Sequence, residues 1–183
     1  MTKGIKRNAL SWLRAKAADE EGSSVIPFIM YVPLFMILVV SSVEFGLYAL
    51  RYVMLDRAVD MTVREIRLGL WRGATHDQIK NDICENTPVI PHCKDVVLVE
   101  MQTISKTTYG PLPATNAVCV DRDADVQPMT TFHGGNPEDL MLIRVCALAD
   151  PFFPTTGLGS YIRKDSTGAY ALVVASIFVD EPT

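Results

Sequence analysis

An uninterrupted apolar run dominates the first third of the chain. No charged residue occurs from Gly22 through Val43, and this run of about 22 residues would extend roughly 33 Å as an α-helix. The hydrocarbon core of a bilayer is about 30 Å thick, whereas the apolar part of a signal peptide has roughly 7–15 residues and precedes a small-residue cleavage site. No such cleavage site follows the run. The pattern therefore predicts a retained membrane span, and a buried core helix is the alternative.

The helical pattern continues beyond the apolar run in amphipathic form. Apolar residues recur every three or four positions and define one helical stripe, formed by Leu55, Val59, Val63, Ile66 and Leu70. The stripe predicts that the same helix continues to about Gly69 and that another element covers it. Pro33 lies inside the apolar half and is expected to kink or loosen the helix, because proline removes a backbone hydrogen bond.

Shorter elements follow the long helix. Thr75 and Gln78 have the capping-box spacing at the start of "THDQIKNDIC", which predicts a second helix. Runs rich in β-branched residues predict strands at 95–104, 140–149 and 170–179, with turn-forming stretches between them. We therefore expect an α+β fold in which a long N-terminal transmembrane and amphipathic helix packs against a small antiparallel sheet, accompanied by a short second helix.

These elements divide the chain into three parts. Residues 1–22 form a charged leader, 23–72 form the transmembrane and amphipathic helix, and 73–183 form an α+β head domain. The formal net charge is −4, and no basic cluster gives the footprint of a nucleic-acid-binding face. Membrane lipid is accordingly an expected partner, and nucleic acid is not.

All four cysteines follow the apolar run, which indicates an oxidising compartment on that side of the membrane. Three pairings are possible, and we prefer Cys84–Cys93 with Cys119–Cys146 because local loops close most easily. Each disulfide would contribute about 3 kcal/mol by the loop-closure argument. Zinc binding is the alternative, since His92 adjoins Cys93, but no C-x-x-C sequence occurs. The cysteines, more than the basic residues present on both sides of the span, place the N-terminus in the cytoplasm and the head outside it.

Enzyme and metal signatures are incomplete throughout the sequence. "GLGS" at 157–160 lacks the third glycine of a dinucleotide-binding loop, and "HGG" at 133–135 has no nucleophile motif to accompany it. "DRDAD" at 121–125 lacks the glycine and glutamate of an EF-hand. The histidines show no metal-ligand spacing: His76, His92 and His133. We expect no catalytic residue, cofactor or metal site.

Two features call for separate hypotheses. Glu44 interrupts the apolar run near its far end, and an ionisable residue in a span is a functional candidate, with snorkelling to water as the alternative. Phe152 and Phe153 stand between two prolines, and a rigid loop of this kind would present aromatic side chains to a partner. Packing of both rings under the sheet is the alternative.

The N-terminal sequence resembles a known family. "EEG" is followed by small residues, an unbroken apolar run with Pro33, and "VEFGLYALRYVMLDRAVDMTVREIRLG". These features, over about residues 20–70, resemble the TadE/TadG-like pseudopilins of the bacterial tight-adherence (Tad, or Flp) pilus. The resemblance implies a single-pass protein of the inner membrane with a cytoplasmic N-terminus and a periplasmic head.

The resemblance also implies a processing site between Gly22 and Ser23, where a prepilin-type peptidase would remove the leader and leave the span in place. One residue departs from the prepilin pattern. The fifth position after the cut is usually a glutamate that can neutralise a neighbouring subunit's terminal amine, but here it is Pro27. Either the protein does not pack as a repeated filament subunit, or another group such as Glu44 compensates.

The expected function is that of a minor, pilin-like protein that acts through protein contacts in pilus assembly. Its partners would be other pilins or pseudopilins and the assembly platform. The alternative is a permanently anchored scaffold of a secretion complex, and an anchored hydrolase is a third class. Small residues in the helix would allow close helix approach: Ser23, Ser24, Ser41, Ser42 and Gly46.

Overall fold

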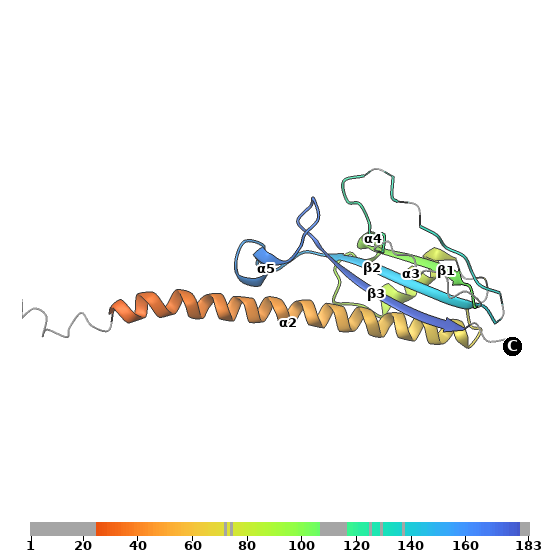
Figure 1. The fold of residues 1–183 in the computed structure, drawn as a ribbon, viewed down its shortest axis with the longest axis horizontal. Coiled ribbons are helices and arrows are strands. Elements are labelled where there is room, and N and C mark those ends of the chain that lie inside the picture. The colour runs from red at the N-terminus through yellow and green to blue at the C-terminus, as the bar shows by residue number, and fades with distance from the viewer. Residues whose placement is uncertain are drawn as a thin grey trace, which may run out of the picture.

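A long helix carries a small α+β head on its C-terminal half in the computed structural model (Figure 1). The structure describes residues 25–71, 73, 75–106, 117–124, 126–128, 130–136 and 138–179, so the leader and the Gly22–Ser23 bond lie outside the described residues. The elements within these ranges are α2 (Val25–Arg67), α3 (His76–Glu85), α4 (Cys93–Val96), β1 (Val97–Ile104), β2 (Leu140–Ala149), α5 (Gly157–Tyr161) and β3 (Tyr170–Val179). This arrangement is the predicted α+β fold.

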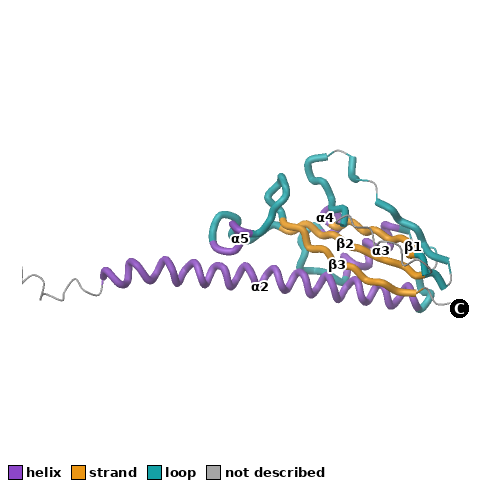
Figure 2. The backbone as a smooth tube through the Cα atoms, viewed as in Figure 1, coloured by secondary structure: helices purple, strands orange, loops and turns teal. Residues whose placement is uncertain are grey.

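Helix α2 joins the apolar run and the amphipathic segment in one continuous element (Figure 2). It passes through Pro33 and ends at Arg67, two residues before the predicted end. Gly69, with φ 74°, then donates its N–H to the carbonyl of Ile66, and Leu70 donates to the carbonyl of Glu65. This Schellman motif satisfies the last carbonyls of the helix and explains the glycine, because the left-handed conformation disfavours other residues. Leu70 consequently leaves the stripe and is 70% exposed, so its predicted place in the stripe is wrong.

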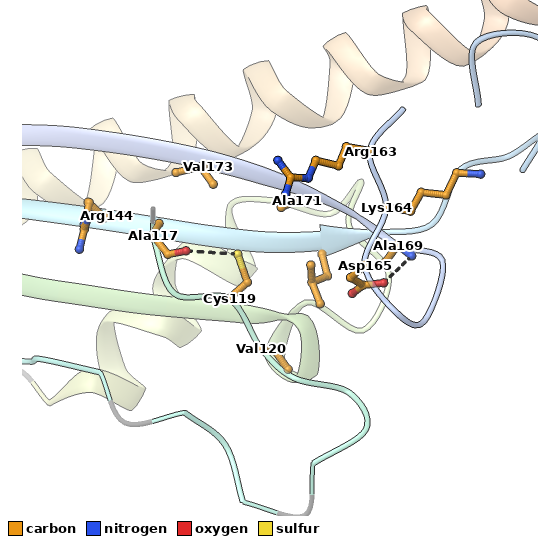
Figure 3. A pocket seen from close by; sticks show the side chains of 11 residues that line it. Ala117, Cys119, Val120, Arg144, Arg163, Lys164, Asp165, Ala169, Ala171 and Val173 are labelled. Atoms are coloured by element: carbon orange, nitrogen blue, oxygen red, sulfur yellow. Dashed lines mark hydrogen bonds between the residues drawn. The ribbon is translucent and has the colours of Figure 1, made fainter. Parts of the chain in front are cut away.

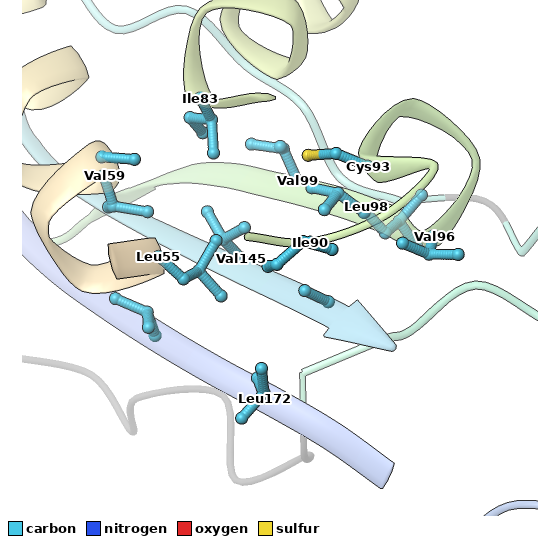
Figure 4. Packing of buried hydrophobic residues seen from close by; sticks show 14 of the residues in the cluster. Leu55, Val59, Ile83, Ile90, Cys93, Val96, Leu98, Val99, Val145 and Leu172 are labelled. Atoms are coloured by element: carbon cyan, nitrogen blue, oxygen red, sulfur yellow. The ribbon is translucent and has the colours of Figure 1, made fainter. Parts of the chain in front are cut away.

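The predicted stripe forms the helical side of the head's core. Leu55 and Val59 are completely buried, and they pack in one cluster with Val145 of β2 and Leu172 of β3 (Figure 4). Burying a side chain of this size stabilises a fold by about 1.5–3 kcal/mol relative to leaving it exposed. The amphipathic half of α2 is therefore a structural part of the head.

The sheet is antiparallel in the order β1-β2-β3, so β2 lies in the centre. The predicted bounds of the second and third strands agree with β2 and β3. The first strand begins at Val97 and not at residue 95, because the chain first makes the helical turn α4, in which Asp95 donates its N–H to the carbonyl of His92. Glu100 of β1 and Arg144 of β2 are directly paired and form an ion pair with an N–O distance of 2.8 Å.

Helix α3 begins with the predicted capping box. The backbone N–H of Gln78 donates to the Thr75 hydroxyl, and the Gln78 side chain accepts from the N–H of Thr75. Thr62 Oγ1 on α2 lies 2.6 Å from Asp82 Oδ2, which fixes α3 against the long helix. A local sequence signal thus starts α3, and a tertiary contact decides where it lies.

The four cysteines form two disulfides, Cys84–Cys93 and Cys119–Cys146. This is the pairing preferred from the sequence, and it leaves none of the four thiols available for zinc. The first bond joins the end of α3 to the start of α4, and the second ties the loop that contains Cys119 to the central strand. Both bonds stabilise the head and neither involves α2.

We predict that the paired substitution Cys119→Ala/Cys146→Ala destabilises the head by about 3–4 kcal/mol, because it releases a longer loop in the unfolded chain than Cys84→Ala/Cys93→Ala does. The sequence separations are 27 and 9 residues, respectively. Denaturant unfolding of the detergent-solubilised protein, followed by near-ultraviolet circular dichroism, would measure both variants. Greater destabilisation by the Cys84/Cys93 pair would contradict the loop-length argument.

Candidate functional site

The contact face of α2 continues beyond the hydrophobic core toward the N-terminus, but its residues become polar. Ser41, Glu44, Tyr48 and Arg51 follow one another at spacings of three, four and three, in line with Leu55. We call these four residues the polar seam. The segment that contacts it is residues 150–161, which follows β2 and includes α5, and which we call the return loop (Figure 1).

Glu44 is the centre of the polar seam. Its side chain is completely buried. Its Oε1 accepts the backbone N–H of Phe152 at 3.1 Å, and its Oε2 accepts that of Phe153 at 2.9 Å. Hydrogen bonds to a charged group contribute about 1.5–3 kcal/mol each, and they offset the penalty of burying the carboxylate. The hypothesis that Glu44 snorkels to water is therefore wrong.

Ser41 fixes the C-terminal part of the return loop. Its hydroxyl accepts the backbone N–H of Leu158 at 3.2 Å. A Cβ on Gly157 would lie 2.6 Å from Ser41 Oγ, and a Cβ on Gly159 would lie 2.2 Å from the carbonyl oxygen of Phe153. The two glycines of "GLGS" therefore permit close packing of backbone on the helix. Because Ser41 contacts its own head, it does not belong to the small residues available for another helix, whereas Ser42 and Gly46 remain exposed.

Arg51 fixes the first residue of the return loop, where the chain leaves β2. Its Nη1 donates to the carbonyl of Asp150 at 2.8 Å and to the hydroxyl oxygen of Tyr170 at 2.7 Å. The ring of Tyr170 also lies 5.4 Å from that of Tyr48. Burial raises the pKa of Tyr170 above its ordinary value, while the hydrogen bond and positive charge of Arg51 act in the opposite direction. The seam thus joins α2 to both the loop and β3.

The two adjacent phenylalanines, Phe152 and Phe153, differ in their solvent exposure. Their rings meet edge to face with centroids 4.9 Å apart. Phe153 is partly buried, whereas Phe152 is 65% exposed, so packing of both rings under the sheet is wrong. The backbone of this pair holds the Glu44 carboxylate, and the Phe152 ring faces outward.

A second concave region lies on the sheet face opposite the hydrophobic core. The hollow has a volume of about 750 Å³, and its lining includes Arg144, Lys164 and the disulfide-bonded Cys119 (Figure 3). Arg144 pairs with Glu100, and the Lys164 ammonium donates to the carbonyl of Pro154. Among the described residues that line it there is no serine, histidine or free thiol.

The other sequence candidates are dispersed. His76 lies beside Asp77 and packs against Phe132, while His92 and His133 are exposed. In "DRDAD", the Asp121 carboxylate accepts the N–H of Asp123, and Asp125 lies outside the described residues. No group of three or more potential metal ligands occurs in the part of the chain that the structure describes.

Of the residues in this site, only Glu44 stands out in the sequence, and Tyr48, Arg51 and Tyr170 were not predicted to join it. The available signal was spacing: Tyr48 and Arg51 extend the Leu55 stripe by whole helical turns toward Glu44. A search for apolar residues passes over them because they are aromatic and basic. Nothing in the local sequence of Tyr170 points to α2, since that contact joins residues 119 positions apart.

We predict that Glu44→Ala detaches the return loop from α2, because the N–H groups of Phe152 and Phe153 lose their acceptors. Hydrogen exchange at these amides should accelerate at least about tenfold, as expected for the loss of about 1.5–3 kcal/mol per bond. Glu44→Gln, which keeps one acceptor oxygen, should have a smaller effect. Asp60→Ala, at an exposed position of the same helix, is the control. Unchanged exchange in Glu44→Ala would contradict the role of the carboxylate.

We predict that Arg51→Met raises the pKa of Tyr170 further, because the group that opposes the effect of burial is removed. The folded state already holds this phenolic proton more tightly than the unfolded state. Its contribution to stability is therefore present below the ordinary pKa of 10.0 and is lost as the pH rises above it. Nuclear magnetic resonance of ring-labelled tyrosine would follow the titration. Arg57→Met, an exposed neighbour, should leave the Tyr170 pKa unchanged.

The long helix matches a known protein family. Residues 22–64 match the family model described as TadE-like protein. No curated protein and no solved structure matches the chain. The matched residues contain the apolar run, all four residues of the polar seam and most of the core stripe. The sheet and both disulfides lie outside them. The resemblance of the N-terminal helix to the TadE-like family is thereby confirmed.

Proposed function

We propose that the protein is a minor, pilin-like (pseudopilin) component of a tight-adherence pilus system that acts through protein contacts and not through catalysis. The observation that carries the proposal is that the two halves of α2 have different roles. One half of this TadE-like helix is exposed and apolar, and the other half is the core of a folded head. Any contact made by the exposed half therefore also positions the head.

The exposed half of α2 supports membrane insertion. Helix α2 is long and apolar enough to cross a membrane, and none of its most apolar 18-residue window is buried. Ile29, Tyr31 and Phe35 are each more than half exposed, so the alternative of a buried core helix is wrong for this segment. An apolar face of this size requires lipid or the helices of a partner.

The head supports placement outside the cytoplasm. Both disulfides lie in it, and disulfides persist in oxidising compartments such as the periplasm. In this proposal the protein crosses the bacterial inner membrane once, with the N-terminus in the cytoplasm and the head in the periplasm. A prepilin-type peptidase would cut between Gly22 and Ser23 at the cytoplasmic face.

The polar seam bears on whether the protein enters a filament. Pro27 occupies the position where prepilins carry a glutamate, and Glu44 was the proposed substitute. Both Glu44 oxygens are hydrogen-bonded to the protein's own backbone, and the side chain is completely buried. Glu44 is thus engaged within its own chain, which argues against its use to neutralise a neighbouring subunit's amine. This observation favours a second candidate, a permanently anchored scaffold of the secretion complex that never joins a filament.

We predict that mass spectrometry of the mature protein finds Ser23 at the N-terminus and that Gly22→Lys abolishes this processing. Asn8→Lys adds the same charge inside the leader and should leave processing intact. Recovery of the protein in sheared pili would support the filament component, whereas retention in the membrane after processing would support the scaffold. An intact leader in the wild-type protein would overturn the pseudopilin proposal.

A further inference from the structure

The return loop contacts α2 inside its uncharged run. Leu158 donates its N–H to Ser41 Oγ, and Ser41 lies within the segment that has no charged residue up to Val43. Figure 2 shows the loop beside α5 reaching along α2 toward the part of the helix that no other drawn element covers. The head therefore has one segment at the level where the apolar run ends.

That level coincides with the edge of a bilayer. A hydrocarbon core of about 30 Å needs about 20 apolar residues, and the uncharged run of the sequence, which begins at Gly22, ends at Val43. Ser41 and Glu44, the residues that hold the return loop, lie on either side of this position. If α2 spans the membrane, the return loop lies at its non-cytoplasmic surface.

The exposed side chains of this region suit a lipid–water boundary. Phe152 is 65% exposed, Tyr161 at the end of α5 is 88% exposed, and Phe45 on the adjacent turn of α2 is 61% exposed. Aromatic side chains are enriched at both membrane interfaces, especially tyrosine, whose polar end meets water. The Lys164 ammonium donates to the carbonyl of Pro154, which places a cation beside the loop, favourable for headgroup phosphates.

Side chains of α2 satisfy three backbone N–H groups of the return loop. The N–H groups of Phe152 and Phe153 are bound by Glu44, and that of Leu158 is bound by Ser41. Backbone groups that approach lipid need such partners, because the bilayer interior offers no water to replace them. The polar seam thus supplies what a loop partly immersed in the interface requires.

We infer that the return loop is a membrane-contacting foot of the head, with Phe152 and Tyr161 inserted among the phospholipid headgroups of the non-cytoplasmic leaflet. The inference rests on the membrane span of the proposed function. The foot gives the head a second contact with the bilayer besides α2. Two contacts restrict the tilt and rotation of the head, which a single helix would leave free.

Depth-dependent quenching tests this inference on the full chain in phosphatidylethanolamine–phosphatidylglycerol vesicles. Trp12→Phe and Trp71→Phe first remove the native tryptophans. Phe152→Trp then reports on the foot, Phe35→Trp on the span, and Val126→Trp, at an 81% exposed position of the head, on water. With lipids brominated near the headgroup end of the acyl chain, Phe152→Trp should lose about half of its emission or more, as expected for an interfacial aromatic side chain. Val126→Trp should be unaffected.

The possible results test the membrane contact of the return loop separately from the membrane span of α2. Quenching of Phe35→Trp by lipids brominated deep in the acyl chain, without shallow quenching of Phe152→Trp, would overturn the foot and leave the span intact. Absence of quenching at Phe35→Trp would overturn the span and therefore the proposed function as well. A blue-shifted but unquenched Phe152→Trp would assign this side chain to a protein contact and overturn the inference. Tyr161→Trp repeats the test at a second exposed position, in case Phe152→Trp disturbs the loop.

Discussion

The carboxylate of Glu44 lies where the apolar run of α2 ends, completely buried and hydrogen-bonded by two backbone N–H groups of the return loop. A charge in this place is unfavourable unless it is fully satisfied. The loop is also held by Ser41, by its close glycine contacts, and by Arg122 and Lys164, which donate to the Asp150 carboxylate and to the carbonyl of Pro154. The position of the return loop on the helix therefore depends on this interaction, while the buried stripe that includes Leu55 and Val59 fixes the rest of the head.

From this constraint follows the division of α2 into two environments. Toward the N-terminus the helix is exposed and apolar, and toward the C-terminus its stripe is the core of the head. The polar seam occupies the boundary, where hydrogen bonds and aromatic contacts can satisfy groups that neither lipid nor a hydrophobic core would accept. The helix and the head therefore act as one unit, and the two disulfides stabilise the head independently of α2.

Much of the fold was predictable because its signals are local. Twenty or more uncharged residues imply a span, a three-and-four spacing implies an amphipathic helix, and Thr75 with Gln78 implies a helix start. The errors have local causes too: α4 takes the first residues assigned to a strand, and the Schellman motif at Gly69 removes Leu70 from the stripe. These are differences of a few residues at element ends, where hydrogen bonding decides the boundary.

The sequence by itself determined that an apolar helix leads into an amphipathic one, that a small antiparallel sheet covers the amphipathic part, and that the head contains four cysteines. It also singled out Glu44, the charged residue that ends the apolar run. Only the tertiary structure decided what Glu44 does, since its partners follow it by more than 100 positions and are backbone N–H groups. Every residue but proline carries such a donor, so no residue type in the sequence marks them. For the same reason, the sequence does not show that the N–H of Leu158 binds Ser41. The close packing that requires the glycines of "GLGS" is likewise visible only in the folded chain.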